Sequence, residues 1–191
     1  MGISLAKGEA ISLEKRAPGL TRVAMAIGWD VAKGGFLGFG GGGDIDLDAS
    51  AILFDSAGQT VDMVWFRDLK TKNDPVYHSG DNRTGAGDGD DETIYIDLSR
   101  LPANVVSIVL TVNSFQGQTF GKVQNAYVRL VDLKTNAEVA KFDLASKGSR
   151  DTGFVMAVLS RKSGAWDLKA IGEAAAGRTV VDLTQTAARH L

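Results

Sequence analysis

The chain has 191 residues, of which 44% are hydrophobic and 23% charged, a composition typical of a globular protein with a buried core. Its formal net charge of −2 argues against a nucleic acid as a partner, and the absence of cysteine excludes disulfides, zinc–thiolate sites and thiol catalysis. Because it lacks a secretory signal pattern and any run near the roughly 18 apolar residues of a membrane-spanning helix, we expect a cytoplasmic protein without a transmembrane segment.

Most of the chain alternates apolar and polar residues with the period of two that is typical of β-strands. In chain order, this pattern predicts strands at residues 20–27, 44–54, 93–97, 105–112, 126–131 and 154–159. Turn signals separate the apolar segments at 57–58, 73–75, 101–102, 134–136 and 163–164. Many short strands at this spacing predict an all-β fold, an antiparallel β-sandwich of two sheets, which we expect to form a single domain over residues 1–191.

Only the end of the chain, from about residue 172 to residue 191, has a helical pattern. Five residues there fall at helical spacing and predict a face that packs on a sheet. They are Val180, Val181, Leu183, Thr184 and Ala187.

A glycine tract at residues 34–43 interrupts the strand pattern and carries Phe36, Leu37 and Phe39. Its composition favours a flexible loop between two strands. The alternative is an aromatic contact loop for a protein partner or a membrane surface, and the sequence leaves the role of the tract open.

The segment 44–54 alternates from its first residue, which predicts a strand with Asp44, Asp46 and Asp48 on one face and apolar residues on the other. Carboxylates two residues apart along a strand lie about 7 Å apart and repel each other unless a cation or a base intervenes. This stretch alone fits a solvated strand face and a cation site equally well.

A second acidic segment, residues 78–92, alternates acids with glycines just before the predicted strand at Thr93. Calcium takes roughly six to eight oxygens from carboxylates, amide and backbone carbonyls and water, and this segment supplies that mixture. Magnesium is an alternative, but a crowd of protein oxygens fits calcium better. The segment is not an EF-hand loop, because counting from Asp81 places Glu92 correctly at the last position but Ala86 where the turn requires glycine.

With the Gly28-Trp-Asp30 element, these segments resemble the TerD family of tellurium-resistance and general stress proteins. The likeness runs nearly the whole chain and includes the motifs Asp46-Leu-Asp-Ala-Ser50, Gly80-Asp-Asn-Arg-Thr-Gly85, Gly89-Asp-Asp-Glu92 and Phe120-Gly-Lys-Val-Gln-Asn-Ala126. The resemblance implies a β-sandwich whose acidic loops bind one or two calcium ions. It also implies a cytoplasmic stress-response protein, peripheral at the inner membrane, with protein partners in a membrane-associated complex.

Carried over by position, the resemblance implies a set of metal ligands from which Asp44 is absent. The set is Asp30, Asp46, Asp48, Asp81, Asn82, Asp88, Asp90, Asp91 and Glu92. Three departures from the family pattern stand out. Ala86 replaces a common Glu, the glycine tract replaces a short polar loop, and residues 113–117 lack the His and Asp that relatives often have there.

Three functions are consistent with these features, and we expect the first, a non-enzymatic calcium-binding stress protein. The second is a metal-dependent phosphoester enzyme, because clustered aspartates can hold catalytic metals. No recognisable nucleophile accompanies them, and His78 is the candidate base. The third is a ligand-binding or partner-binding adaptor that uses the glycine tract.

Overall fold

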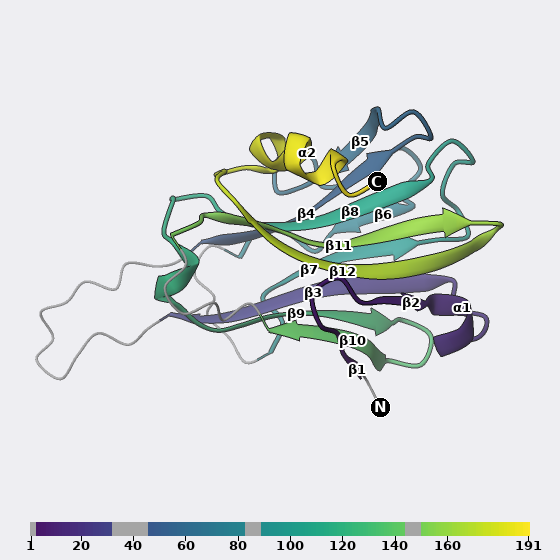
Figure 1. The fold of residues 1–191 in the computed structure, drawn as a ribbon, viewed down its shortest axis with the longest axis horizontal. Coiled ribbons are helices and arrows are strands. Elements are labelled where there is room, and N and C mark those ends of the chain that lie inside the picture. Colours follow the sequence, from purple (N-terminus) through teal and green to yellow (C-terminus); the bar gives the residue numbers. More distant parts are fainter. Residues whose placement is uncertain (1–2, 32–45, 83–88, 144–149) are drawn as a thin grey trace, which may run out of the picture.

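The computed structural model describes the backbone of residues 3–31, 46–82, 89–143 and 150–191, together with most of their side chains. Two six-stranded sheets lie face to face, and a C-terminal helix covers one of them (Figure 1). Sheet A has the strand order β1 (Ile3–Ser4), β10 (Ala137–Asp143), β9 (Val123–Asp132), β3 (Arg22–Val31), β7 (Glu92–Asp97), β6 (Val76–His78). Sheet B has the order β2 (Ala10–Ser12), β12 (Ala165–Ala175), β11 (Gly153–Lys162), β8 (Ser107–Ser114), β4 (Leu47–Phe54), β5 (Thr60–Val64).

Among the described strands, every pairing is antiparallel except that of β1 with β10, so the predicted antiparallel β-sandwich is confirmed. All six predicted strands are present, with bounds shifted by a few residues. The predicted turns are confirmed where the backbone takes positive φ, as at Gly58, Asn136 and Gly164. The strands that the sequence did not predict include the edge strands β1, β2 and β6, which are too short to carry a periodic signal.

The described helices are α1 (Leu13–Arg16), the 3₁₀ turn η1 (Phe120–Lys122) and α2 (Val180–Ala188). The prediction of helix from residue 172 was wrong at its start, because β12 stays paired with β11 as far as Ala175. The helix begins only after Thr179, whose side chain and that of Asp182 form a reciprocal capping box. Val181 was wrongly placed on the packing face, since it is 56% exposed.

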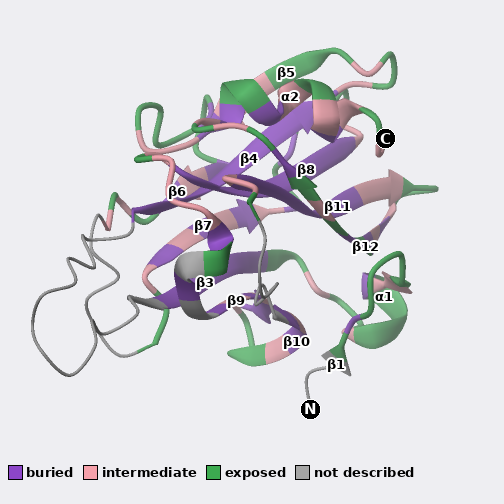
Figure 2. Cartoon of the chain, turned by 60° about the vertical axis from the view of Figure 1, so that its left-hand side comes forward, coloured by how far each residue is buried: buried purple, intermediate pink, exposed green. Residues whose placement is uncertain are grey.

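Helix α2 packs on the outer face of sheet B, so the strands beneath it are buried on both sides (Figure 1). Alternate residues of β4 point inward to the main core, where Leu47, Ala49 and Leu53 lie, and outward to α2, where Ile52 and Phe54 lie. Figure 2 shows β4 and β8 buried along their lengths, as their side-chain exposures require. Any polar residue on the outer face of these two strands is therefore withdrawn from solvent.

Candidate metal centre

Three aspartates converge at one end of the sandwich. Asp46 directly precedes β4 of sheet B, Asp48 is the second residue of that strand, and Asp81 follows β6 of sheet A. One carboxylate oxygen from each lies within 4.8 Å of the other two. Asp46 is 4% exposed and Asp48 is 2% exposed, so the interpretation of this segment as a solvated strand face is wrong. Asp81 is exposed and forms the solvent side of the cluster.

The surroundings of Asp48 disfavour the ionised form of its carboxyl group. Burial, together with the nearby charges of Glu92, Asp46 and Asp81, raises the pKa of Asp48 to about 8, although a hydrogen bond from Asn113 opposes the shift. Without a cation, Asp48 therefore holds a proton at neutral pH. A divalent cation among these oxygens would favour the ionised carboxylate instead.

Glu92 is fully buried and bonds to the segments that carry the cluster. Its Oε2 accepts a hydrogen bond of 2.8 Å from the backbone N–H of Ala49 in β4, and its Oε1 accepts one of 3.0 Å from Asn82 N. A side chain of sheet A thus holds both the strand that carries Asp48 and the loop that carries Asp81.

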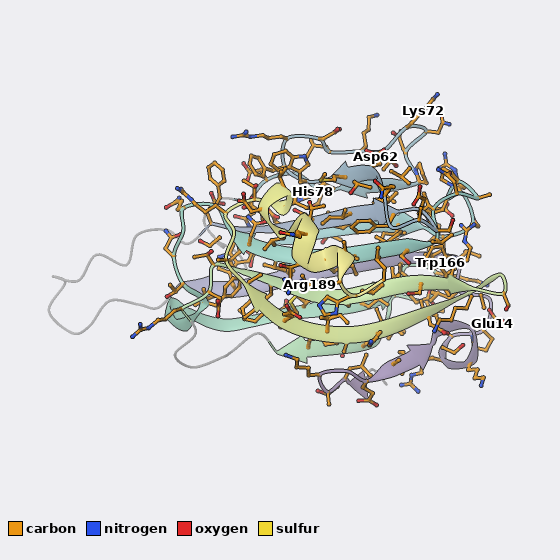
Figure 3. The ribbon with its side chains drawn as sticks, turned by 45° about the horizontal axis from the view of Figure 1, so that its top comes forward. Glu14, Asp62, Lys72, His78, Trp166 and Arg189 are labelled. Atoms are coloured by element: carbon orange, nitrogen blue, oxygen red, sulfur yellow. The ribbon has the colours of Figure 1, made fainter. Side chains whose placement is uncertain are left out.

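His78, labelled in Figure 3, lies next to Glu92, and neither side chain has any exposed surface. Its Nδ1 accepts a hydrogen bond of 3.0 Å from Gly80 N, which assigns the ring proton to Nε2. Nε2 lies 3.2 Å from Oε2 of Glu92, without the geometry of a normal hydrogen bond. His78 therefore orients the turn before Asp81.

Asp91 and Asn82 connect the loop to β3. The carboxylate of Asp91 accepts hydrogen bonds from Trp29 N at Oδ2 (2.9 Å) and from Asn82 Nδ2 at Oδ1 (3.0 Å). Its own N–H donates to Ile27 O at 2.7 Å. These contacts fix the loop backbone beside the cluster.

Asp90 points to the outer side of sheet A and does not join the three-carboxylate cluster. Arg129 binds it through two hydrogen bonds, Nε to Oδ1 at 2.8 Å and Nη2 to Oδ2 at 2.6 Å, and Tyr127 OH donates to Oδ1 at 3.0 Å. Burial and the hydrogen bond to Asp90 raise the pKa of Tyr127 to about 12. Tyr127 reaches Asp90 across Gly28, where a Cβ would lie 2.6 Å from the tyrosine ring, so only glycine fits there.

The remaining predicted ligands are not placed. Asp30 belongs to β3 opposite Gln124, but its side chain lies outside the part of the chain that the structure describes. Asp88, Asp44 and the glycine tract 34–43 also lie outside the described residues.

Asn113 is a site residue that the sequence did not single out as a contact. It lies opposite Asp48 in the β4–β8 register, is fully buried, and donates from Nδ2 to Asp48 Oδ2 at 2.8 Å. The only signal in the sequence was its departure from the family pattern.

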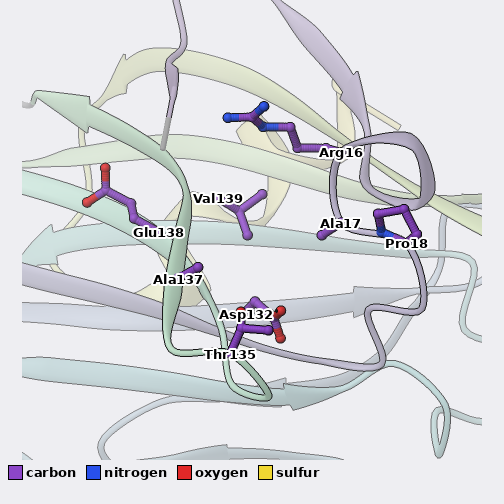
Figure 4. A pocket seen from close by; sticks show the side chains of 8 residues that line it. All are labelled: Arg16, Ala17, Pro18, Asp132, Thr135, Ala137, Glu138 and Val139. Atoms are coloured by element: carbon purple, nitrogen blue, oxygen red, sulfur yellow. Dashed lines mark hydrogen bonds between the residues drawn. The ribbon is translucent and has the colours of Figure 1, made fainter. Parts of the chain in front are cut away.

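The cluster has the chemistry of a hard-cation site, because all of its donor atoms are carboxylate oxygens. A separate pocket of about 320 Å³ is lined by residues that include Arg16, Asp132 and Glu138, and it does not contain the carboxylate cluster (Figure 4). It lies at the opposite end of β9, and both oxygens of Asp132 already accept hydrogen bonds, from Lys134 N and Thr135 Oγ1. None of the described helices has the length and apolar character to cross a bilayer.

Fold and site define a β-sandwich protein that gathers acidic oxygen donors from both sheets at one end. The chain matches the TerD domain model over residues 1–186 and belongs to the TerD family. It is 50% identical over 184 residues to tellurium resistance protein TerZ of Serratia marcescens, covering 95% of this chain and 94% of that protein.

A second relative is general stress protein 16U of Bacillus subtilis (strain 168), 43% identical over 179 residues with 90% of each chain covered. A crystal structure of a Streptomyces coelicolor A3(2) homologue of the telluride resistance protein TerD has the same fold. Its TM-score is 0.72 at 22% identity, over 87% of this chain and 96% of that one.

Proposed function

We propose that this chain is a non-enzymatic calcium-binding module that acts in the response to tellurium compounds and other stresses. The observation that carries the proposal is the convergence of Asp46, Asp48 and Asp81, whose carboxylate oxygens lie within 4.8 Å of one another although two of them are buried. Similar proteins are named for tellurium resistance and for general stress, which supports the biological part of the proposal.

Calcium fits these residues better than other common ions. Buried carboxylates at this separation repel strongly, and a bound cation removes that repulsion without the proton that Asp48 otherwise holds. The nearest imidazole, His78, uses Nδ1 to accept a hydrogen bond from Gly80, so nitrogen-preferring metals gain little from it. Asp46, Asp48 and Asp81 would hold the first of one or two ions, with the oxygens of Asn82 and Glu92 close by. Magnesium demands a stricter octahedral geometry and keeps more water.

Isothermal titration calorimetry on the chelator-treated protein tests this proposal. We expect calcium to bind more tightly than magnesium, and Asp81→Asn to weaken calcium binding at least about tenfold. The matched control is Glu14→Gln, which removes one carboxylate from α1 at a distance from the cluster. If the unmodified protein takes up no calcium at millimolar concentration, the proposal fails.

We also propose that the module works within a larger protein assembly, peripheral at the cytoplasmic face of the inner membrane. Its support is a surface cluster of Trp65, Phe66 and Phe115, whose rings meet edge to face at centroid distances of 4.9 and 5.2 Å. The exposed guanidinium of Arg67 lies within 5.9 Å of all three ring centroids. Tryptophan and arginine are over-represented among residues that dominate binding energy at protein interfaces.

This surface adjoins the metal centre, because Phe115 N donates to Asp46 O at 3.2 Å. The double substitution Phe66→Ser and Arg67→Ser should abolish recovery of the partner with a tagged chain and leave calcium binding unchanged. Deletion of residues 34–43 tests the glycine tract in the same assay. Unchanged recovery with both variants, or a chain found only in the soluble fraction of gently lysed cells, would contradict this part of the proposal.

The geometry does not favour the phosphoester-enzyme alternative. A general base must reach the group that it deprotonates. The candidate base His78 is enclosed between the sheets, with Nδ1 engaged by Gly80. Turnover of a phosphodiester with Mn²⁺ or Mg²⁺, abolished by Asp81→Asn, would restore that alternative.

A further inference from the structure

One side chain connects the carboxylate cluster to the segment that leads into α2. Nδ2 of Asn113 donates one hydrogen bond to Asp48 Oδ2 at 2.8 Å and another to the backbone carbonyl of Arg178 at 2.7 Å. Arg178 stands two residues before the first residue of α2, Val180. A single amide nitrogen therefore holds a site carboxylate on one side and the entry to the helix on the other.

An asparagine at this position is unfavourable for the free energy of folding. Asn113 is fully buried, and its Oδ1 has no hydrogen-bond partner among the described residues. A buried unpaired acceptor costs free energy that an apolar residue of similar size would avoid, as Val109 does on the same face of β8. The two hydrogen bonds from Nδ2 are the contribution that an apolar residue would lack.

The entry to α2 has a second anchor that does not involve the cluster. Oγ1 of Thr152 donates to Gly177 O at 2.8 Å and accepts from Gly177 N at 3.1 Å. Helix α2 itself is held by Val180, Leu183 and Ala187, which are fully buried against sheet B. The contribution of Asn113 to α2 docking can therefore be separated experimentally from that of Thr152.

We propose that Asn113 is a positioning residue that couples cation binding at the carboxylate cluster to the docking of α2. The proposal rests on the proposed function, because it requires calcium to bind at Asp46, Asp48 and Asp81. A cation coordinated by Asp48 fixes the position of its carboxylate, whose Oδ2 accepts the hydrogen bond from Asn113. The amide of Asn113 is then fixed against Asp48, and its other N–H is fixed against Arg178 O.

As a consequence, the docking of α2 depends on whether a cation is bound at the carboxylate cluster. Opening of α2 would expose the apolar outer face of sheet B, where Ile52, Phe54 and Val109 lie. Calcium would suppress this opening, and by thermodynamic reciprocity a docked helix would favour calcium binding. Cation binding at the carboxylate cluster thereby controls access to the apolar outer face of sheet B beneath α2.

Hydrogen–deuterium exchange of the amides from residue 177 to residue 188 tests the coupling, with the full chain in chelator and in saturating calcium. We expect calcium to slow exchange at these amides about fivefold or more in the unmodified chain, the lower end of typical coupling between sites. Asn113→Ala should still bind calcium, with reduced affinity, but should lose this calcium-dependent slowing. Asn113→Ser serves the same purpose if the alanine variant does not fold.

Thr152→Val is the matched control, because it removes an anchor of the α2 entry that does not touch the cluster. Exchange in this variant should be faster in both conditions, with the calcium-dependent ratio retained. A merely structural role for Asn113 would lower protection equally with and without calcium, and would leave that ratio unchanged. Calcium binding with unchanged α2 exchange in the unmodified chain overturns the coupling alone. Absence of calcium binding by calorimetry overturns both the coupling and the proposed function.

Discussion

Ala49 donates its backbone N–H to the carboxylate of Glu92 over 2.8 Å and so joins the two sheets at the acidic end of the sandwich. Ala49 belongs to β4 of sheet B, and Glu92 is the first residue of β7 in sheet A. The side chain of Ala49 points into the main core while its N–H faces the carboxylate. Glu92 therefore supports the geometry of the site by bonding to backbone.

The substitution Glu92→Ala should destabilise the protein strongly. It leaves the N–H groups of Ala49 and Asn82 without their acceptor, and Ala49 is fully buried. Each orphaned buried donor costs about 1–3 kcal/mol, so we expect a loss of about 2–5 kcal/mol in the free energy of unfolding. Urea denaturation in chelator measures it, with Glu14→Gln as the control. A loss equal to that of the control would show that the bridge between the sheets is dispensable.

The stability of the calcium-free protein should fall as the pH rises from about 4 to about 8. The pKa of Asp48 is raised from 3.8 to about 8, chiefly by burial. In this range the native state holds a proton that the unfolded chain has released, so a rise in pH favours unfolding. Saturating calcium should remove this slope, because calcium binds the ionised carboxylate and expels the proton.

Urea denaturation in chelator at several pH values between 5 and 8 tests this, with Asp48→Asn as the comparison. The asparagine variant lacks the titrating group, so the difference in unfolding free energy between the two proteins isolates Asp48. A difference that does not change with pH would contradict the raised pKa.

The substitution Asp90→Asn should leave calcium affinity nearly unchanged, whereas Asp81→Asn should weaken it. The reason is that Arg129 and Tyr127 already occupy both oxygens of Asp90 on the outer side of sheet A. The same variant should lower the pKa of Tyr127 from about 12 towards its usual value, because the hydrogen bond to an ionised acceptor is lost. Calorimetry and ultraviolet titration of the tyrosines measure the two effects. A large loss of calcium affinity would place Asp90 among the ligands after all.

The substitution Leu183→Ala should cost about 2–4 kcal/mol in the free energy of unfolding. Leu183 is fully buried, and its methyl groups fill the space beside Gly153 and Gly177, where an added Cβ would lie 2.9 Å from Leu183 Cδ2. Val181→Ala on the same helix is the control, with an expected change within about 0.5 kcal/mol because Val181 is 56% exposed. Equal losses from the two variants in urea denaturation would mean that α2 does not pack as described.

The sequence by itself determined the type of fold and the chemistry of the site. A period of two is a local property of each segment, so the alternation in residues 44–54 was enough to separate the inward Leu47 and Ala49 from the outward Asp46 and Asp48. The acidic loop before β7 was equally readable, because carboxylates and glycines at short spacing need no distant partner to be recognised.

Only the tertiary structure decided which acids meet and how deeply they are buried. Asp81 and Asp90 are both acids of one loop, yet Asp81 meets the start of β4 while Asp90 pairs with Arg129. The helix α2 withdraws the outer face of β4 from solvent and gives Asn113 its second acceptor at Arg178. These outcomes depend on the register between strands and on packing between segments far apart in the chain, and no local pattern encodes either one.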